Sequence, residues 1–260
     1  MDTVYVIKIG GNIIDNEAAL ASFLRGFAAV PGKKVLVHGG GKLATQLAAR
    51  LGVEQQMVAG RRITDAETLK IVTMVYAGYI NKNIVAQLQS NGVNAIGLTG
   101  ADGNMIKAHK RKHADIDYGF VGDIDGVEGT FIKKMLDENI TIVAAPITHD
   151  GNGQLLNTNA DTIAQEIATG LGNLYEVQLV YSFEKKGVLR DVNDEGSVID
   201  KIDTAAYADL KAKQLIFAGM IPKLDNAFSA LNKGVKKVII GKAEELDQLV
   251  AGNSGTTIVL

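Results

Sequence analysis

The sequence predicts an α/β fold, a three-layer αβα sandwich with a mainly parallel central sheet. Short apolar runs rich in β-branched residues alternate with helical patterns, which is typical of a parallel sheet covered by helices on both faces. No linker, repeat or low-complexity segment interrupts this alternation. The 260 residues suffice for one sizeable core, or for two lobes that share one sheet. We therefore expect a single compact unit.

Seven apolar segments are predicted to be strands. Each of the first five is followed by a turn or a polar loop, as expected at the end of a strand. The segments are residues 4–9, 34–37, 95–99, 140–145, 177–181, 237–240 and 257–259.

Two helices have recognisable start signals. Asp15 can cap the first helix, and Thr64 or Asp65 can cap a long helix that ends at Asn91-Gly92. The apolar face of the first helix carries Leu20, Phe23, Leu24 and Phe27. The long helix is apolar on more than one side, at Ile71, Val72, Met74, Val75, Tyr76, Tyr79 and Ile80. This pattern fits deep burial and a self-association surface equally well.

The region after the third strand differs from the rest of the chain. Residues 106–112 and 118–124 read as a polar hairpin that could cover a ligand. A boundary between lobes would fall near residues 161–172, where a helix leads into a new strand. We therefore divide the chain into an N-terminal lobe, residues 1–165, and a C-terminal lobe, residues 166–260.

Composition narrows the possible partners and compartments. A formal net charge of −2 and a pI near 6.1 give no general attraction to nucleic acid or anionic lipid. The absence of cysteine rules out disulfides and thiolate zinc sites and suits a reducing compartment. The apolar runs are shorter than the roughly 18 residues of a membrane span, and the N-terminus has no signal-peptide pattern. We expect a cytoplasmic protein that binds neither membranes nor nucleic acid.

Two glycine clusters follow predicted strands. Lys8 stands inside the first strand, directly before Gly10-Gly11, and His38-Gly39-Gly40-Gly41-Lys42 follows the second strand and opens a helix. A lysine in an apolar run requires a nearby anion, and glycines let backbone N–H groups approach a ligand oxygen. Neither cluster matches a nucleotide-binding fingerprint, and each alone is most simply a tight turn. Together they indicate an anion site.

Two further segments have both a functional and a structural interpretation. Residues 157–161, Asn-Thr-Asn-Ala-Asp, start a helix; Asn159 can simply cap it, or Asp161 can hold lysines in position. In Gly219-Met220-Ile221-Pro222-Lys223, Pro222 suits a first helical turn and places Lys223 at the positive end of the helix. Lys223 then either faces solvent or contacts an anion.

Other polar residues give weaker signals. Arg62 precedes the long helix and could bind a carboxylate, although an ordinary surface arginine explains it as well. His109 and His113 have helical metal-ligand spacing, but they lie in a basic segment without an acid or thiol nearby. We favour a solvated loop there and predict no protein metal site.

These segments together resemble the amino acid kinase family, and within it the branch that acts on N-acetyl-L-glutamate. The motifs are Lys8-Ile-Gly-Gly, Val37-His-Gly-Gly-Gly, Gly60-Arg-Arg-Ile-Thr, Leu156-Asn-Thr-Asn-Ala-Asp and Gly219-Met-Ile-Pro-Lys, and they span nearly the whole chain. The resemblance implies an enzyme that phosphorylates the side-chain carboxylate of N-acetyl-L-glutamate with ATP and Mg²⁺, giving N-acetyl-L-glutamyl 5-phosphate in arginine biosynthesis. It assigns the acyl-glutamate and the dimer contact to the N-terminal lobe and ATP to the C-terminal lobe.

The resemblance also implies roles for individual residues. Lys8 would contact the transferring phosphoryl group, Lys223 would stabilise the leaving phosphate oxygens, and Asp161 would hold both ammonium groups. Substrate contacts would come from Gly40, Gly41, Arg62 and Asn157. Phosphate and nucleotide contacts would come from Gly10, Gly11, Glu184, Gly187, Leu189, Gly219 and Met220.

One departure from the family pattern affects the nucleotide site. Glu184 stands where this branch usually has an aspartate, and Lys185 and Lys186 follow it, while Gly187 to Leu189 are retained. The adenosine contacts are therefore open, and a non-catalytic nucleotide-binding sensor is an alternative. N-succinyl-L-glutamate is an alternative substrate. Because the chain starts at its first strand, the resemblance also implies a homodimer without arginine feedback.

Overall fold

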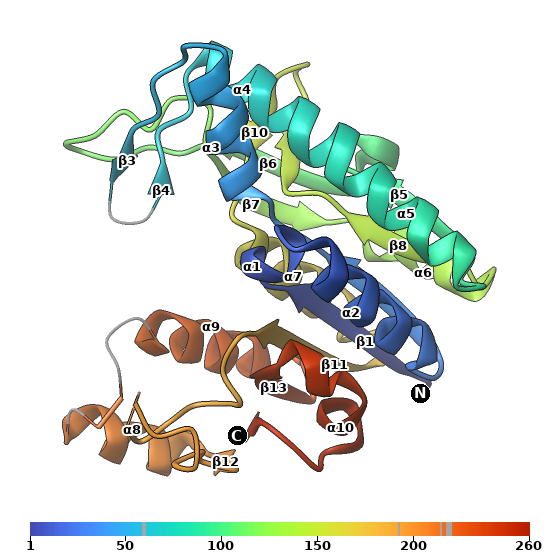
Figure 1. Ribbon diagram of the computed structural model, residues 1–260, viewed down its shortest axis with the longest axis vertical. Helices are drawn as coiled ribbons and strands as arrows, with labels where there is room; N and C mark the ends of the chain where they lie inside the picture. The colour runs from blue at the N-terminus through green and yellow to red at the C-terminus, as the bar shows by residue number, and fades with distance from the viewer. Residues whose placement is uncertain (59–60, 192, 214, 217–219) are drawn as a thin grey trace.

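The computed structural model describes residues 1–58, 61–191, 193–213, 215–216 and 220–260. Its main feature is an eight-stranded sheet with the strand order β12-β14-β13-β11-β1-β2-β8-β5. Helices cover both faces, which confirms the predicted αβα sandwich (Figure 1). Within the described residues, no helix is long and apolar enough to span a bilayer.

All seven predicted strands lie in this sheet. They are β1 (Thr3–Ile9), β2 (Lys33–Val37), β5 (Ala95–Leu98), β8 (Thr141–Ala144), β11 (Glu176–Phe183), β13 (Lys237–Lys242) and β14 (Thr256–Ile258). The strands from β5 to β13 in the sheet order are parallel, and β14 pairs antiparallel with β13. The eighth strand, β12 (Lys201–Ile202), was not predicted, because two residues carry no periodic signal.

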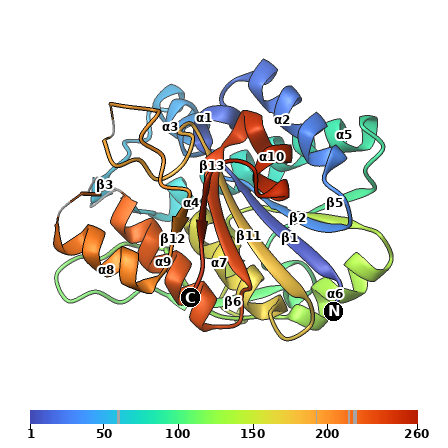
Figure 2. The ribbon, with the colours of Figure 1, turned by 90° about the horizontal axis from the view of Figure 1, so that it is seen from below.

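Alternation along the strands divides the core into two layers. On β1, Val4 and Val6 pack on one face of the sheet, and Ile7 and Ile9 pack on the other. Figure 2 shows the helices above and below the sheet. One layer consists of α2 (Glu17–Ala29), α3 (Gly41–Arg50), α4 (Ala66–Thr73), α5 (Asn81–Ser90) and α10 (Leu246–Ala251). The opposite layer consists of α6 (Gly129–Asp137), α7 (Ala160–Leu171), α8 (Thr204–Ala212) and α9 (Ile221–Asn232).

The first predicted cap is wrong by one residue. Asn16 caps α2, because its side-chain oxygen accepts a hydrogen bond from the backbone N–H of Ala19 at 3.0 Å. Asp15 instead ends the short helix α1 (Gly11–Ile14), which lies between β1 and α2. Because α1 extends to Ile14 and Asp15 ends it, α2 starts one residue later than expected and Asn16 takes the capping position.

The long helix begins and ends as predicted. The Asp65 carboxylate accepts a hydrogen bond from the N–H of Thr68 at 2.7 Å, and helical structure continues to Ser90, before Asn91. Its middle turns form a π-helical segment, η1 (Met74–Ile80). Most of its apolar residues are buried, whereas Met74 is 54% exposed and Tyr79 is 64% exposed. Burial therefore explains most of the apolar pattern, and the remainder forms an exposed apolar patch.

The predicted polar hairpin is present and belongs to a second sheet. Strands β6 (Ile106–Lys110) and β7 (Gly122–Val127) pair antiparallel. They join β9 (Ile147–His149) and β10 (Leu155–Asn157) in the order β10-β9-β6-β7, and this sheet was not predicted. A small hairpin consists of β3 (Met57–Val58) and β4 (Arg61–Arg62). In Figure 1 this hairpin lies at upper left and α8 at lower left. Short 3₁₀ turns, η2 (Asp102–Asn104) and η4 (Ala243–Glu245), complete the fold.

The topology brings the sequence motifs to one edge of the main sheet. Strands β1, β2, β8 and β11 are parallel, so their carboxyl ends lie at the same edge. Gly10 follows β1, His38 follows β2 and Glu184 follows β11. Open α/β sheets bind ligands at this edge. The predicted lobe boundary at residue 165 falls within α7 and remains a prediction.

Candidate active site

Two lysines from distant parts of the chain share one carboxylate. Lys8 Nζ lies 2.7 Å from Asp161 Oδ1, and Lys223 Nζ lies 2.8 Å from Asp161 Oδ2. Lys8 comes from β1, Asp161 from the first turn of α7, and Lys223 from the first turn of α9. Lys8 shares its sheet face with Val4 and Val6, so it points toward the layer that contains α7. The side chains of Lys8 and Asp161 are only 15% and 21% exposed.

Asp161 is held in its ionised form. Burial alone would raise its pKa, but the charges of Lys8 and Lys223 and their hydrogen bonds outweigh burial and lower the pKa of Asp161 to about 2. The Tyr181 hydroxyl donates to the backbone oxygen of Asp161 at 3.3 Å, which helps to fix the start of α7. One carboxylate therefore faces two ammonium groups, and the trio has an excess of positive charge that can attract an anion.

A cleft of about 220 Å³ adjoins the start of α7. All four predicted substrate residues line it, namely Gly40, Gly41, Arg62 and Asn157. The first residues of α3 and α7 also line it, so two helix N-termini open on one cavity. Asn159 caps α7, as its structural interpretation predicted, by accepting from the N–H groups of Asp161 and Thr162.

A side chain at Gly40 would strain the backbone and displace a neighbouring side chain. The φ of Gly40 is +145°, and a Cβ built there would lie 2.2 Å from Ile80 Cδ1. The glycine loop therefore packs directly against η1, with Gly40 as the cap residue of α3 and no side chain capping that helix. This packing leaves the N-terminal N–H groups of α3 at the cleft.

Arg62 and Asn157 are fixed by neighbours at the cleft wall. The Arg62 guanidinium donates to the Gly41 carbonyl and to Thr45 Oγ1, both at 2.9 Å, and to Gln55 Oε1. Asn157 Nδ2 donates to Thr64 Oγ1 at 3.0 Å. Arg62 is thus already oriented, as a carboxylate-binding residue should be.

The N–H group of Gly10, expected to donate to a phosphate, is engaged within the protein in this structure, so the phosphate contact of Gly10 remains a prediction. The Gly10 N–H donates to the Ser182 carbonyl at 2.8 Å, and a Cβ at Gly10 would approach that same oxygen at 3.2 Å. Gly10 therefore permits close packing of β1 against the end of β11. Gly11 begins α1, so its N–H lies at a helix start, where donation to a ligand remains possible.

The remaining predicted nucleotide residues are spread over the C-terminal part. Glu184 accepts a hydrogen bond from Asn12 Nδ2, which ties the altered segment to α1. Gly187 packs tightly on Thr256, and Leu189 is buried. Met220 precedes α9 directly, while Gly219 and Gly60 lie outside the described residues. Their contacts with a nucleotide remain predictions.

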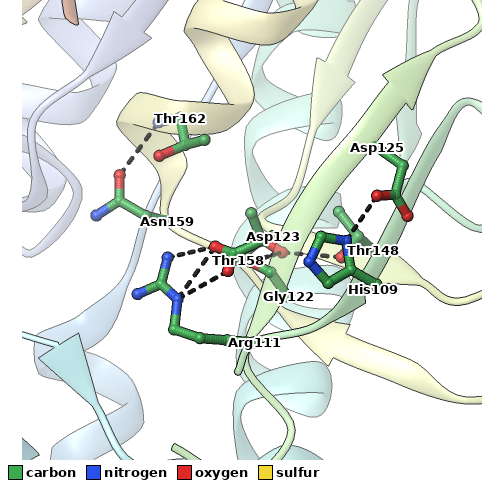
Figure 3. A network of polar contacts seen from close by, with 9 residues as sticks. All are labelled: His109, Arg111, Gly122, Asp123, Asp125, Thr148, Thr158, Asn159 and Thr162. Atoms are coloured by element: carbon green, nitrogen blue, oxygen red, sulfur yellow. Dashed lines mark hydrogen bonds and ion pairs between the residues drawn. The ribbon is translucent and has the colours of Figure 1, made fainter. Parts of the chain in front are cut away.

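The sequence analysis missed a charged pair in the cleft wall. Arg111 directly follows β6 and reaches Asp123 on β7, beside Thr158 (Figure 3). Arg111 Nε lies 3.1 Å from both Asp123 oxygens, and its NH2 group makes a further short contact. Hydrogen bonds from Arg111 lower the pKa of Asp123. The available signal was an arginine and an aspartate on the two arms of the predicted hairpin, residues 106–112 and 118–124.

The histidines of the hairpin make local contacts. His109 Nδ1 lies 2.6 Å from Asp125 Oδ1, and no group of three or more metal-binding side chains occurs among the described residues. The basic segment is therefore bound into the hairpin by local charge pairs.

The fold and the site define an α/β protein suited to hold anions: two helix N-termini open on one cleft, and two lysines meet on Asp161, in the first turn of one of those helices. Residues 3–242 match the amino acid kinase family, and the chain belongs to that family. It is 58% identical over 262 residues to the acetylglutamate kinase of Cytophaga hutchinsonii, covering 100% of this chain and 99% of the relative. It is 55% identical over 253 residues to the acetylglutamate kinase of Bacteroides thetaiotaomicron, covering 97% of each.

A solved structure supports the fold independently. N-acetylglutamate synthase from Neisseria gonorrhoeae, complexed with coenzyme A and N-acetyl-glutamate, superimposes with a TM-score of 0.83 at 22% identity. The match covers 100% of this chain and 59% of the synthase, so this chain spans little more than half of that protein. At this identity the likeness concerns the fold alone.

Proposed function

We propose that this chain transfers the γ-phosphoryl group of MgATP to the side-chain carboxylate of N-acetyl-L-glutamate, giving N-acetyl-L-glutamyl 5-phosphate in arginine biosynthesis. The observation that carries the proposal is the pair of lysines on Asp161, at the start of a helix that lines a cleft with Arg62. The names of the relatives, at 55–58% identity, support the same reaction. We also propose a cytoplasmic location.

The site supplies what this reaction needs. The acceptor carboxylate has a reference pKa of about 4.3 and is already ionised at neutral pH, so no general base is required. Asp161 is unsuited to act as a base, because both its oxygens are engaged by lysines. Lys8 and Lys223 instead place positive charge where the transferring group carries negative charge.

Magnesium would be held largely by the nucleotide phosphates. Asp161 is engaged by two lysines and Glu184 by Asn12, so these carboxylates are already satisfied. Mg²⁺ commonly binds through substrate phosphates and retained waters, with few protein ligands, and the residues present fit that mode. When bound, the ion would neutralise phosphate charge beside the lysines.

The proposal is tested by trapping the acyl phosphate with hydroxylamine. Wild-type protein with MgATP and N-acetyl-L-glutamate should give the hydroxamate, and omission of either substrate should abolish it. If no acidic amino acid, acylated or free, gives a product while ATP still binds, the protein is a nucleotide-binding sensor and the proposed reaction is wrong.

N-succinyl-L-glutamate is a second candidate substrate, and Arg111 is the observation that favours it. The Arg111 guanidinium lines the same cleft as Arg62, and Asp123 engages only its Nε and NH2 groups in the described contacts. Arginine has five N–H donors, so donors remain for an additional oxygen group. The ratio of kcat/KM for the succinyl and acetyl substrates decides between the two.

Arg62→Ala is expected to raise the KM for the acyl-glutamate about tenfold to a hundredfold and to change kcat only a few-fold. A charge-assisted hydrogen bond to the α-carboxylate is present in both ground and transition states, so its loss weakens uniform binding. Steady-state kinetics measure this split. Arg25→Ala, an exposed arginine on α2, is the matched control. An unchanged KM for Arg62→Ala would refute the assigned role.

We propose that the chain forms a homodimer through the exposed part of η1. Met74 and Tyr79 border an apolar groove with Leu43 and Leu47 of α3, which continues the apolar side of the long helix. The expected solution mass is about twice 27.6 kDa. Tyr79→Asp should lower the measured mass to that of one chain in light scattering. A wild-type mass of one chain would contradict the dimer.

The lobes are assigned in the same proposal. All residues that line the acyl-glutamate cleft fall between positions 39 and 162, within the N-terminal lobe of residues 1–165. ATP would then bind mainly to residues 166–260, with Lys223 reaching across to Asp161.

A further inference from the structure

His38 is a fully buried histidine that the reaction does not use. It follows β2 and precedes the three glycines at the cleft. Its Nδ1 lies 2.9 Å from the Gly39 carbonyl oxygen, and its Nε2 lies 3.1 Å from Asn81 Nδ2. Asn81 is the first residue of α5, directly after η1. The imidazole thus bridges the glycine loop and the long helix.

Lys82 determines which way this hydrogen-bond chain runs. Lys82 Nζ can only donate, and it lies 3.1 Å from one side-chain atom of Asn81 and 2.7 Å from the Gly97 carbonyl. That atom of Asn81 must therefore be the oxygen, so the Asn81 amide nitrogen faces His38. The same nitrogen donates to the Val143 carbonyl at 2.9 Å. His38 Nε2 must then accept a hydrogen bond, so the proton of the neutral ring is on Nδ1 and is donated to the Gly39 carbonyl.

The orientation of the Gly39 carbonyl sets the direction of the next N–H group. In a trans peptide the carbonyl oxygen of one residue and the N–H of the following residue point in opposite directions. With the Gly39 oxygen held toward His38, the Gly40 N–H points away from it. Gly39, Gly40 and Gly41 all line the cleft, and no acceptor for the Gly40 N–H occurs among the described backbone hydrogen bonds.

We propose that His38 is a positioning residue: the chain Lys82–Asn81–His38 orients the Gly39–Gly40 peptide so that the Gly40 N–H donates to the reacting carboxylate or phosphoryl oxygen. The inference rests on the proposed function for the identity of that anion. Burial lowers the pKa of His38 to about 4, so the ring stays neutral under working conditions and keeps its acceptor nitrogen. The packing of Ile80 against Gly40 supports the same loop from the other side.

Two substitutions of His38 separate positioning from simple packing. The amide nitrogen of asparagine can replace Nδ1, so His38→Asn keeps a donor for the Gly39 carbonyl and loses the contact with Asn81. The amide of glutamine replaces Nε2 instead, so His38→Gln keeps the Asn81 contact and loses the donor to Gly39. Each variant thus retains one half of the bridge.

Of the two variants, His38→Asn should be the more active and His38→Gln the more stable. We expect His38→Gln to lower kcat/KM for the acyl-glutamate at least about tenfold, because a misplaced N–H donor mainly costs transition-state stabilisation. His38→Asn should stay within about threefold of wild type although its thermal midpoint falls further than that of His38→Gln. The KM for MgATP should change little in either variant.

The outcomes test the positioning role of His38 separately from the proposed function. Hydroxamate formation by wild type in the same assay tests the reaction itself. If wild type is active and His38→Asn loses more activity than His38→Gln, the histidine is only a packing residue and the inference is overturned. If either variant fails to fold, Lys82→Met decides. A drop of about threefold or more in the kcat/KM of Lys82→Met supports the positioning role of Lys82, Asn81 and His38, and an unchanged kcat/KM overturns it.

Discussion

Lys8→Ala is expected to reduce kcat about 100-fold to 1000-fold while the KM for the acyl-glutamate changes only a few-fold. Removal of one preorganised donor from a developing negative charge costs this much in comparable sites. Lys8 is mostly buried beside Asp161, where its charge is weakly screened, and its partner strands β2 and β11 fix its position. Lys223→Ala should have an effect of the same kind, because it holds the other oxygen of Asp161.

Single-turnover and steady-state kinetics with MgATP measure this effect. Lys70→Ala is the control, because Lys70 pairs with Glu67 on the surface of α4, and both of those side chains are more than 60% exposed. Its kcat should equal that of wild type. A Lys8 or Lys223 variant with normal kcat and a raised KM would mean that the lysine only binds the ground state.

Asp161→Asn is expected to reduce kcat about tenfold to a hundredfold and to destabilise the fold. The substitution keeps the shape of the side chain but leaves two ammonium groups close together without their shared counter-charge, and one of them faces an amide nitrogen. Removing one member of a buried charged group costs roughly 3–5 kcal/mol, and partial exposure of these side chains favours the lower end of that range. Urea unfolding at neutral pH measures the loss, and unchanged stability together with unchanged kcat would refute the organising role.

The acid dependence of stability gives a second test of Asp161. The pKa of Asp161 in the folded protein, about 2, lies below its ordinary value of 3.8. The ionised carboxylate therefore stabilises the fold above about pH 4, and this contribution is lost as the pH falls toward 2. The shift corresponds to roughly 2–3 kcal/mol. Stability of wild type should therefore fall more steeply than that of Asp161→Asn between pH 4 and pH 2. Equal slopes for the two proteins would contradict the assignment.

The sequence predicted the main sheet well because its strands are buried on both faces. Strands β2 and β8 each contain a continuous apolar run, Val35-Leu36-Val37 and Ile142-Val143-Ala144, and such runs bounded by turns admit few other interpretations. The second sheet escaped prediction because β9 and β10 have three residues each and follow β8 after only short connections. Short strands carry little periodicity, and their pairing depends on contacts with β6, far away in the chain.

The site was also predicted only in part. Lys8 and Lys223 break local rules, since one charge stands in an apolar strand and the other at the positive end of a helix, and such conflicts often mark functional sites. Asp161 does not, because an acidic residue is favoured in the first turn of a helix, so only the resemblance assigned its role. Gly10 was assigned a phosphate contact because nothing in the sequence reveals that its N–H meets Ser182, on a neighbouring strand. Arg111 was missed because its contact with Asp123 depends on how the hairpin folds. The hydrogen bonds of His38 were missed because its partner Asn81 is 43 residues away in the sequence, directly after the π-helical segment η1.

A structure with MgADP, N-acetyl-L-glutamate and a planar phosphoryl mimic such as aluminium fluoride tests the central claim most directly. The account predicts that the Nζ atoms of Lys8 and Lys223 both lie within about 3.2 Å of the mimic or of its bridging oxygens, while each still contacts Asp161. Binding of the mimic at a place that neither ammonium group reaches would contradict it.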